Sequence, residues 1–263
     1  MADSADNQSL KLHFSKYDLE PETKFLTTKA TVEKMLADIK SAAPYLYAPI
    51  IRDERTNIYY DTNGFRLYRM GFECRGRKFG DGEYRHDMKT PEKAEDGPIG
   101  PDRNGIFLRR EYNRVSSNST PHLRDFSESG LDDALEDIDD KNLKAWVKGY
   151  FTRQRVTFMP APGTEVEIAF ENGYYQTMNN SHKSEEMWIV ELELKKGNNL
   201  QALIDTANML KQRYGLKVCV KTKGEMGMEF ARQFMDADHQ AKFDKSTSER
   251  SALYTPLRRQ FGI

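Results

Sequence analysis

The sequence predicts an α+β protein in which short antiparallel strands form a barrel or a strongly curved sheet, with helices outside it. From about residue 55 onward, short segments alternate charged and apolar residues with the period of two that is typical of strands. Turn residues separate these segments, and a few amphipathic helices lie between them. Together these observations favour a barrel over a helical bundle.

The first strand is expected at residues 20–26, and the next, at 57–62, ends in the turn signal Asn63-Gly64. Further strands are expected at 65–77, 83–89, 106–114, 151–159, 165–171, 188–195 and 216–223. Residues 78–82 predict a hairpin turn. Residues 91–105, which are rich in proline, glycine and charge, predict a loop.

Helices are expected where apolar residues recur at a spacing of three and four. Residues 30–43 show this pattern, and so do residues 199–214, which Gly215 would end. The stretch 131–150 is first acidic and then amphipathic, which predicts one or two short helices. Another helix is expected within residues 224–241.

Composition excludes several classes of protein. The 263 residues suffice for one large domain or two small ones. Lys and Arg number 40 against 41 Asp and Glu, so no overall positive field would attract nucleic acid. There is no run of 18 apolar residues to span a membrane, and the first residues lack the apolar stretch of a signal peptide. Two cysteines, Cys74 and Cys219, fit a reducing compartment, so we expect a cytoplasmic protein.

Charged side chains share one face of most predicted strands. These same-face sets are Glu20, Glu22 and Lys24; Glu73, Arg75 and Arg77; Arg85, Asp87 and Lys89; Arg109, Glu111 and Asn113; Arg153 and Arg155; Glu165, Glu167 and Glu171; Glu191, Glu193 and Lys195; and Lys221 and Lys223. One explanation is that these faces are solvated faces of an antiparallel sheet. The alternative is a closed barrel with a charged interior and helices covering its apolar outside.

A barrel interior with charges of both signs has a chemical use. Clustered carboxylates repel one another unless a cation joins them. Mg²⁺ or Mn²⁺ prefers carboxylate oxygens and binds readily beside phosphate, while Arg and Lys bind polyanionic phosphate groups. Such an interior therefore suits a complex of a metal ion with a polyphosphate, whereas a sugar or lipid site would not require it.

The segment Glu20-x-Glu22-x-Lys24 resembles the E-x-E-x-K signature of the CYTH group, the triphosphate tunnel metalloenzymes. Similar segments follow in the family's order: NIYYDT at 57–62, MGFECRGR at 70–77, Met88-Lys89, LRREYN at 108–113, RQR at 153–155, VEIAFENG at 166–173, ELELKKG at 191–197 and VKTKGEMG at 220–227. The resemblance covers roughly residues 15–231 and looks closest to bacterial inorganic triphosphatases.

The resemblance implies an eight-stranded antiparallel β-barrel tunnel, at residues 15–231, between a flexible leader at 1–14 and a helical or polar tail at 232–263. It implies Mg²⁺- or Mn²⁺-dependent hydrolysis of the terminal phosphate of a triphosphate, with inorganic tripolyphosphate as the expected substrate. Thiamine triphosphatase, class IV adenylate cyclase and non-catalytic binding of a nucleotide or polyphosphate are the alternatives. The expected partner is a small-molecule triphosphate, with no nucleic acid or membrane, and a homodimer is an option for the oligomeric state.

Roles are carried over position by position from the resemblance. Metal binding falls to Glu20, Glu22, Glu111, Glu167, Glu191 and Glu193. Substrate binding falls to Lys24, Arg75, Arg77, Lys89, Arg109, Arg153, Arg155, Lys221 and Lys223, and the catalytic set is Lys24, Glu111 and Glu167. Two positions depart from the family pattern and remove positive charge: Glu73 and Met226 each stand where an arginine is expected.

Overall fold

The computed structural model describes residues 18–46, 49–79, 83–92, 105–129 and 131–261. The leader predicted at 1–14 and most of the loop predicted at 91–105 lie outside these ranges. The elements are β1 (Asp18–Thr27), α1 (Lys29–Leu46), β2 (Ile51–Thr62), α2 (Arg66–Arg69), β3 (Glu73–Phe79), β4 (Glu83–Pro91), β5 (Ile106–Ser116), η1 (Leu123–Ser129), α3 (Asp132–Leu135), η2 (Asp140–Asn142), β6 (Leu143–Ala161), β7 (Thr164–Thr177), β8 (Met187–Lys196), α4 (Leu200–Tyr214), β9 (Lys217–Val218), α5 (Lys223–Arg232) and α6 (Ala237–Phe261). None of the helices in the described ranges has the length and apolar character that a membrane-spanning helix requires.

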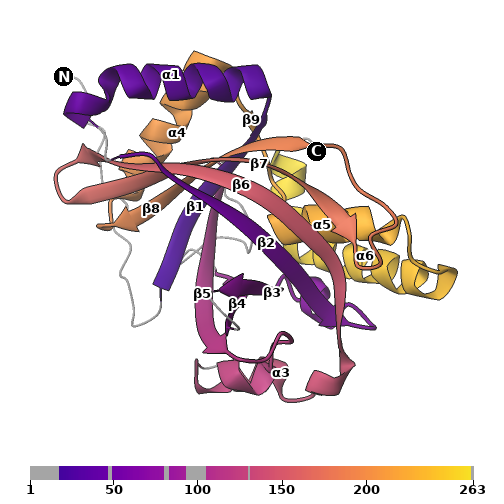
Figure 1. Cartoon of the computed structure of the whole chain (residues 1–263). Coiled ribbons are helices and arrows are strands. Elements are labelled where there is room, and N and C mark those ends of the chain that lie inside the picture. The colour runs from indigo at the N-terminus through magenta and orange to yellow at the C-terminus, as the bar shows by residue number, and fades with distance from the viewer. Residues whose placement is uncertain (1–17, 47–48, 80–82, 93–104, 130, 262–263) are drawn as a thin grey trace.

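Eight of the strands close into an antiparallel barrel. Their order is β5-β4-β3-β2-β6-β7-β8-β1, and β1 pairs with β5 to complete the ring (Figure 1). On β1, Glu22 is opposite Glu193 of β8 on one side and opposite Phe107 of β5 on the other. The predicted α+β class, an eight-stranded antiparallel β-barrel tunnel with helices packed outside, is therefore confirmed.

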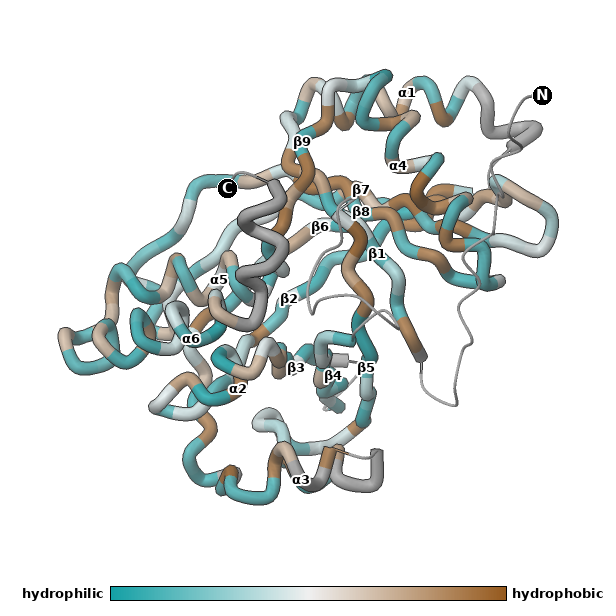
Figure 2. The backbone as a smooth tube through the Cα atoms, turned by 180° about the vertical axis from the view of Figure 1, so that it is seen from behind, coloured by the Kyte–Doolittle hydropathy of each residue, from teal (hydrophilic) through white to brown (hydrophobic). Residues whose placement is uncertain are grey.

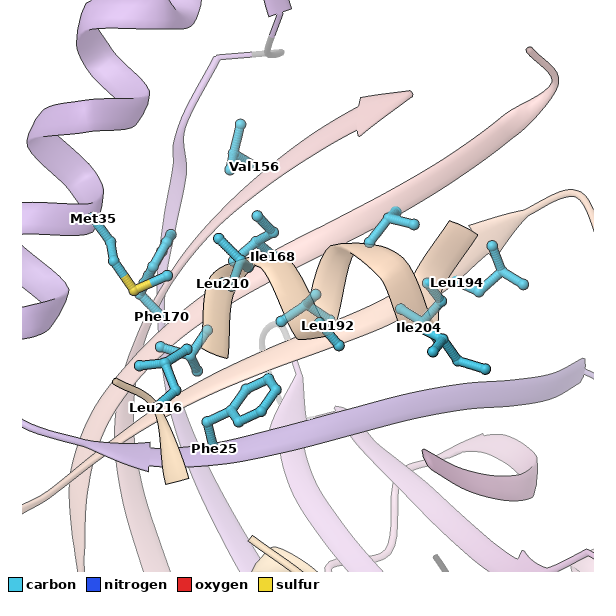
Figure 3. Close-up of a cluster of buried hydrophobic side chains, with 14 of the residues drawn as sticks. Phe25, Met35, Val156, Ile168, Phe170, Leu192, Leu194, Ile204, Leu210 and Leu216 are labelled. Carbon is cyan, nitrogen blue, oxygen red and sulfur yellow. The ribbon is translucent and has the colours of Figure 1, made fainter. Parts of the chain in front are cut away.

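Most apolar residues of the alternating strands face outward and are covered by helices. Residues from β1, β6, β7 and β8 pack with α1 and α4 in one cluster, which includes Phe25, Met35, Ile168, Leu192 and Ile204 (Figure 3). Burying these side chains drives the strands together. The charged residues between them must then point into the barrel, because successive strand residues face opposite sides. The alternative of solvated sheet faces is therefore wrong.

A second apolar cluster lies on the outside of β2, β3, β4 and β5. Tyr60, Cys74, Met88 and Tyr112 pack there against residues of η1, α3 and their neighbouring loops, including Phe126. Figure 2 shows that hydrophobic residues concentrate on the strands beside α4, whereas α6 is mostly hydrophilic. The two clusters leave the barrel interior as the place where the strands' charged side chains meet.

Aromatic residues and α5 pack together at one end of the barrel. Tyr59, Phe151 and Tyr175 form a buried cluster with Met228 of α5. Thr222 caps α5, with its hydroxyl accepting from the Glu225 N–H, while the Glu225 carboxylate accepts from the Thr222 N–H. This capping box fixes the direction in which α5 begins.

Residues 65–77 were predicted as one strand, and this prediction is wrong. The strand begins only at Glu73, and α2 precedes it. The Asp61 carboxylate explains the difference, because it accepts hydrogen bonds from the N–H groups of Thr62, Leu67 and Tyr68 and so stabilises a helical turn. Burial raises the pKa of Asp61 to about 7, against the lowering effect of these hydrogen bonds.

Two further segments were assigned wrongly. Residues 143–150, expected to be helical, form the start of β6, because they pair with both β2 and β7 and this tertiary pairing overrides local preference. Residues 216–223, expected to be a strand, keep only the two strand residues of β9, because Thr222 already caps α5. The helix expected within 224–241 is divided between α5 and the start of α6.

We predict that Phe243 anchors α6. Its ring is buried between Phe65 and Tyr68, with centroids 5.1 and 4.7 Å away. Phe243→Ala should lower the free energy of unfolding by about 3–5 kcal/mol, as measured by urea denaturation. Lys245→Ala, at a largely exposed position on the same helix, is the control and should change it by less than about 0.5 kcal/mol. Equal values for the two variants would contradict the packing of α6.

Candidate functional site

The barrel encloses a cavity of about 150 Å³, called here the tunnel cavity. Its lining consists of charged side chains from all eight barrel strands and from the first residue of α5. They are Glu20, Glu22, Arg55, Glu73, Arg75, Arg77, Arg85, Lys89, Arg109, Glu111, Arg153, Arg155, Glu167, Glu191, Glu193, Lys195 and Lys223. No aromatic or aliphatic side chain contributes to this lining among the described residues.

Most carboxylates and most cations of the lining lie on different arcs of the barrel. The neighbouring strands β7, β8 and β1 carry Glu167, Glu191, Glu193, Glu20 and Glu22, and we call this set the acidic wall. The strands β4, β3, β2 and β6 carry Arg85, Lys89, Arg75, Arg77, Arg55, Arg153 and Arg155, and we call this set the basic wall. Strand order thus places most carboxylates opposite most cations across one small space. Glu73 on β3 and Lys195 on β8 are exceptions, and β5 carries both Arg109 and Glu111.

On β1, Glu22 contacts both Lys24 and Arg109, with its Oε1 2.7 Å from the Lys24 Nζ. Burial favours the neutral acid, but Arg109 and Lys24 hold the pKa of Glu22 well below its usual range. Lys24 is fully buried behind the lining, 3.6 Å from Glu191, with its ammonium over the Phe107 ring. Lys24 therefore keeps two acidic-wall residues ionised without lining the cavity itself.

Glu20 and Glu111 approach each other at the junction of β1 and β5. Burial raises the pKa of Glu20 to about 8 against the opposing effect of Lys89, and its hydrogen bond with Glu111 and the charge of Glu193 raise it further. The pKa of Glu111 is lowered, because Lys89 and the hydrogen bond from Glu20 outweigh its burial. The Lys89 Nζ contacts both carboxylates and lies 3.3 Å from Glu111, and the raised pKa of Glu20 favours its protonated form beside the ionised Glu111.

Arg153 and Lys223 connect the carboxylates near α5. Arg153 Nη2 donates to Glu167 at 2.6 Å, and its Nη1 donates to Glu171 at 3.0 Å and to Glu191 at 3.3 Å. Lys223 Nζ lies 2.7 Å from Glu171 and 2.9 Å from Glu191. The pKa of Glu191 is lowered, because Lys223 and Lys24 outweigh its burial.

Arg77 lies where positive charge is least compensated. Its Nε donates to Asn57, and the Arg77 Nη2 lies 3.6 Å from a carboxylate oxygen of Asp87. Burial and the neighbouring Arg75, Arg55 and Arg85 lower the pKa of Arg77 to about 9. A group of arginines with too few carboxylates is a site for an external anion.

The structure brings together nearly all of the residues to which the sequence assigned roles. All six predicted metal ligands line the tunnel cavity, and so do the predicted substrate-binding residues other than Lys24 and Lys221. Lys221 is a correction: it precedes the cap of α5, and its Nζ lies 2.7 Å from Glu229, with much of its side chain exposed. The predicted pairing of Lys221 and Lys223 on one strand face fails because Lys223 begins a helix.

Several charged residues at the site had received no role. Arg55, Arg85 and Lys195 line the tunnel cavity, and Asp87 and Glu171 support it from behind. The alternation of charges had already placed four of these on the same faces as assigned residues. Arg55 was missed because it precedes the segment 57–62 that was predicted as a strand, although it shares the parity of Asn57.

Comparison with known proteins identifies one family and several similar solved structures. Residues 18–225 match the family model of the CYTH domain. Three solved structures have similar folds. They are a candidate adenylate cyclase of Bacillus halodurans (17% identity, 77% of this chain and 92% of that chain, TM-score 0.46), a protein of Pyrococcus horikoshii (17%, 80% and 99%, 0.47) and a candidate adenylyl cyclase of Hippeastrum described as having a dominant triphosphatase activity (12%, 78% and 92%, 0.47).

The comparison with curated proteins gives no match. The family model nevertheless covers most of the chain, including every strand of the barrel and the capping box of α5. The chain therefore belongs to the CYTH domain family.

Proposed function

We propose that this protein binds a triphosphate together with a divalent cation in the tunnel cavity and hydrolyses the terminal phosphoanhydride bond, with inorganic tripolyphosphate as the substrate. One observation carries the proposal: an acidic wall faces a basic wall across a cavity with no aromatic or aliphatic lining among the described residues. A hard cation suits the first wall and phosphate oxygens suit the second.

The donor set of the acidic wall fits a divalent cation. Glu22 and Glu193 are directly opposite each other on neighbouring strands, and Glu167 is the partner of Glu193 on its other side. Glu20 and Glu111 meet beside Lys89, and burial raises the pKa of Glu20 to about 8, so a metal ion bound there would displace a proton. Mg²⁺ or Mn²⁺ would be held by Glu20, Glu22 and Glu193, with Glu111, Glu167 and Glu191 binding or positioning a second ion. A bound ion would neutralise charge on the phosphate oxygens.

The balance of charges fits a polyanion bound with a cation. The lining holds ten cationic and seven anionic side chains, an excess of three positive charges when all are ionised. Tripolyphosphate carries more negative charge than this excess, and a divalent ion makes up part of the difference. Both ligands together therefore leave fewer uncompensated charges inside the barrel than either one alone.

The chain's own residues would bind the phosphate chain and orient and activate the attacking water. Arg75, Arg77, Lys89, Arg109 and the other substrate-binding cations hold the phosphate chain in one geometry, which reduces the entropic cost of the reaction. Glu111 is ionised and faces the cavity, so its carboxylate is suited to orient the attacking water by accepting a hydrogen bond. Glu167 is held by Arg153 and by Arg155 and is suited to the same task. Lys24 acts from behind by keeping Glu22 ionised.

Use of Mg²⁺ or Mn²⁺, a cytoplasmic location and a homodimer remain predictions from the sequence. The alternative substrates, thiamine triphosphate and ATP, both carry an organic ring system. A site for either would be expected to bind that ring with an aromatic or apolar surface. The described lining of the tunnel cavity offers none, which favours the inorganic substrate.

We predict that a phosphate-release screen will rank tripolyphosphate first. With Mg²⁺ or Mn²⁺, kcat/KM for tripolyphosphate should exceed that for ATP, GTP and thiamine triphosphate by about tenfold or more, because the site has no contacts for an organic group. A higher value for thiamine triphosphate, or release of pyrophosphate from ATP, would favour another CYTH activity. Tight binding of all four without turnover would favour a non-catalytic binder.

We predict that the acidic wall is essential for turnover. Glu22→Gln and Glu193→Gln keep the side-chain shape and remove a predicted metal ligand, so metal-dependent kcat should fall by roughly a hundredfold or more. Glu165→Gln is the matched control, because Glu165 is on the same strand as Glu167 but does not line the cavity and pairs with Lys196. It should retain full activity. Unchanged turnover in Glu22→Gln would contradict the assignment.

A further inference from the structure

A second, smaller cavity lies beside the tunnel cavity, toward α5. Its volume is about 20 Å³, and we call it the inner cavity. It is lined by Tyr59, Tyr60, Asp61, Tyr68, Phe72, Glu73, Cys74, Thr222, Gly224, Glu225, Met228 and Arg250. Among the described residues, Glu73 alone lines both cavities. Its side chain is therefore the partition between them.

The Glu73 carboxylate is held in place as an internal anion. Its Oε2 accepts from the Gly224 N–H in the first turn of α5 at 3.1 Å and from Arg109 Nη1 at 3.5 Å. The start of a helix favours negative charge, and so does a guanidinium. The carboxylate also packs directly against Gly224. A Cβ at that position would be only 2.7 Å from the Glu73 Oε2, so a larger residue would not fit there. The donors around Glu73 would thus suit a phosphate oxygen equally well.

The inner cavity has polar groups that Glu73 screens from the tunnel. Tyr59 lines it, and the Tyr59 hydroxyl is buried and has no hydrogen-bond partner among the described residues. Arg250 of α6 forms its wall, with Nη1 donating to the Tyr68 carbonyl at 2.6 Å and Nη2 2.9 Å from Glu225. At about 20 Å³ this space admits roughly one water molecule, so no phosphate group fits while Glu73 stays in place.

We propose that Glu73 is a specificity-determining residue that ends the phosphate-binding site, so that a fourth phosphate group gains no further contact in the tunnel. This inference rests on the proposed function and adds where the binding site for the polyphosphate substrate ends. The negative charge of Glu73 repels a phosphate group that approaches the start of α5, and its bulk closes the way to the inner cavity. Removal of the side chain would join the two cavities and leave the Gly224 N–H, Arg109 and Tyr59 facing the new space.

The test compares the affinities of tripolyphosphate and inorganic tetraphosphate, measured by calorimetry in EDTA so that no turnover occurs. Wild-type protein should bind the two within about threefold of each other. Glu73→Ala should favour tetraphosphate by about tenfold, the effect of one added charge-assisted contact. Glu73→Gln keeps the bulk and removes the charge, so it should bind both more tightly at the wild-type ratio. Glu165→Ala, outside the lining, should change neither value.

A second measurement separates this inference from the proposed function. In Glu73→Ala the start of α5 loses its internal anion, so added inorganic phosphate should raise the melting temperature of this variant more than that of wild type. If wild type binds neither polyphosphate in EDTA and also binds neither with Mg²⁺ present, the proposed function fails, while the phosphate effect still tests the role of Glu73. The inference would be overturned if Glu73→Ala bound tetraphosphate and tripolyphosphate with the same ratio of affinities as wild type. It would also be overturned if phosphate raised the melting temperature of Glu73→Ala no more than that of wild type.

Discussion

Neutralisation of buried charge is the constraint on which the rest of this structure depends. A closed ring of strands brings carboxylates and cations into one cavity, where an unpaired charge is costly. Nearly every lining side chain accordingly has an oppositely charged neighbour, as Glu22 has in Lys24 and Arg109. The balance is least even at two places: Glu20 and Glu111 both contact Lys89, and Arg77 lies among other arginines. These are the places where a cation and an anion from solution would lower the free energy most.

Apolar packing in the outer layers stabilises a fold with this charged interior. The strands bury their apolar faces against α1 and α4 on one side and against η1 and α3 on the other. At the end near Tyr59 and Phe151, α5 packs into the barrel and places Lys223 and Gly224 against carboxylates. Arg250 of α6 holds the same turn through Glu225, so a helix beyond the matched family domain supports one end of the site. Hydrophobic packing outside the barrel thus stabilises charge inside it.

Much of this arrangement could be predicted from the sequence, because the alternation of charged and apolar residues along a strand indicates which residues share a face. The sets around Glu167, Glu191 and Arg153 were grouped correctly before any pairing was known, and the closed ring makes those faces converge. Predictions of secondary structure from the local pattern are wrong where tertiary contacts determine it. Residues 143–150 have helix-compatible spacing but pair with β2 and β7, and α2 forms because the Asp61 carboxylate gathers N–H groups. Which charges pair with which, as for Glu73 with Gly224, depends on three-dimensional proximity that sequence spacing does not contain.

The central claim is that the acidic wall binds a divalent cation inside the barrel. The most direct measurement is anomalous X-ray diffraction from crystals soaked in Mn²⁺, with unsoaked crystals as the reference. Our account predicts an anomalous peak within coordination distance of the carboxylates of Glu22 and Glu193, inside the tunnel cavity. Manganese bound only at exterior carboxylates, such as the Asp236, Asp238 and His239 group at the start of α6, with none in the tunnel, would contradict it.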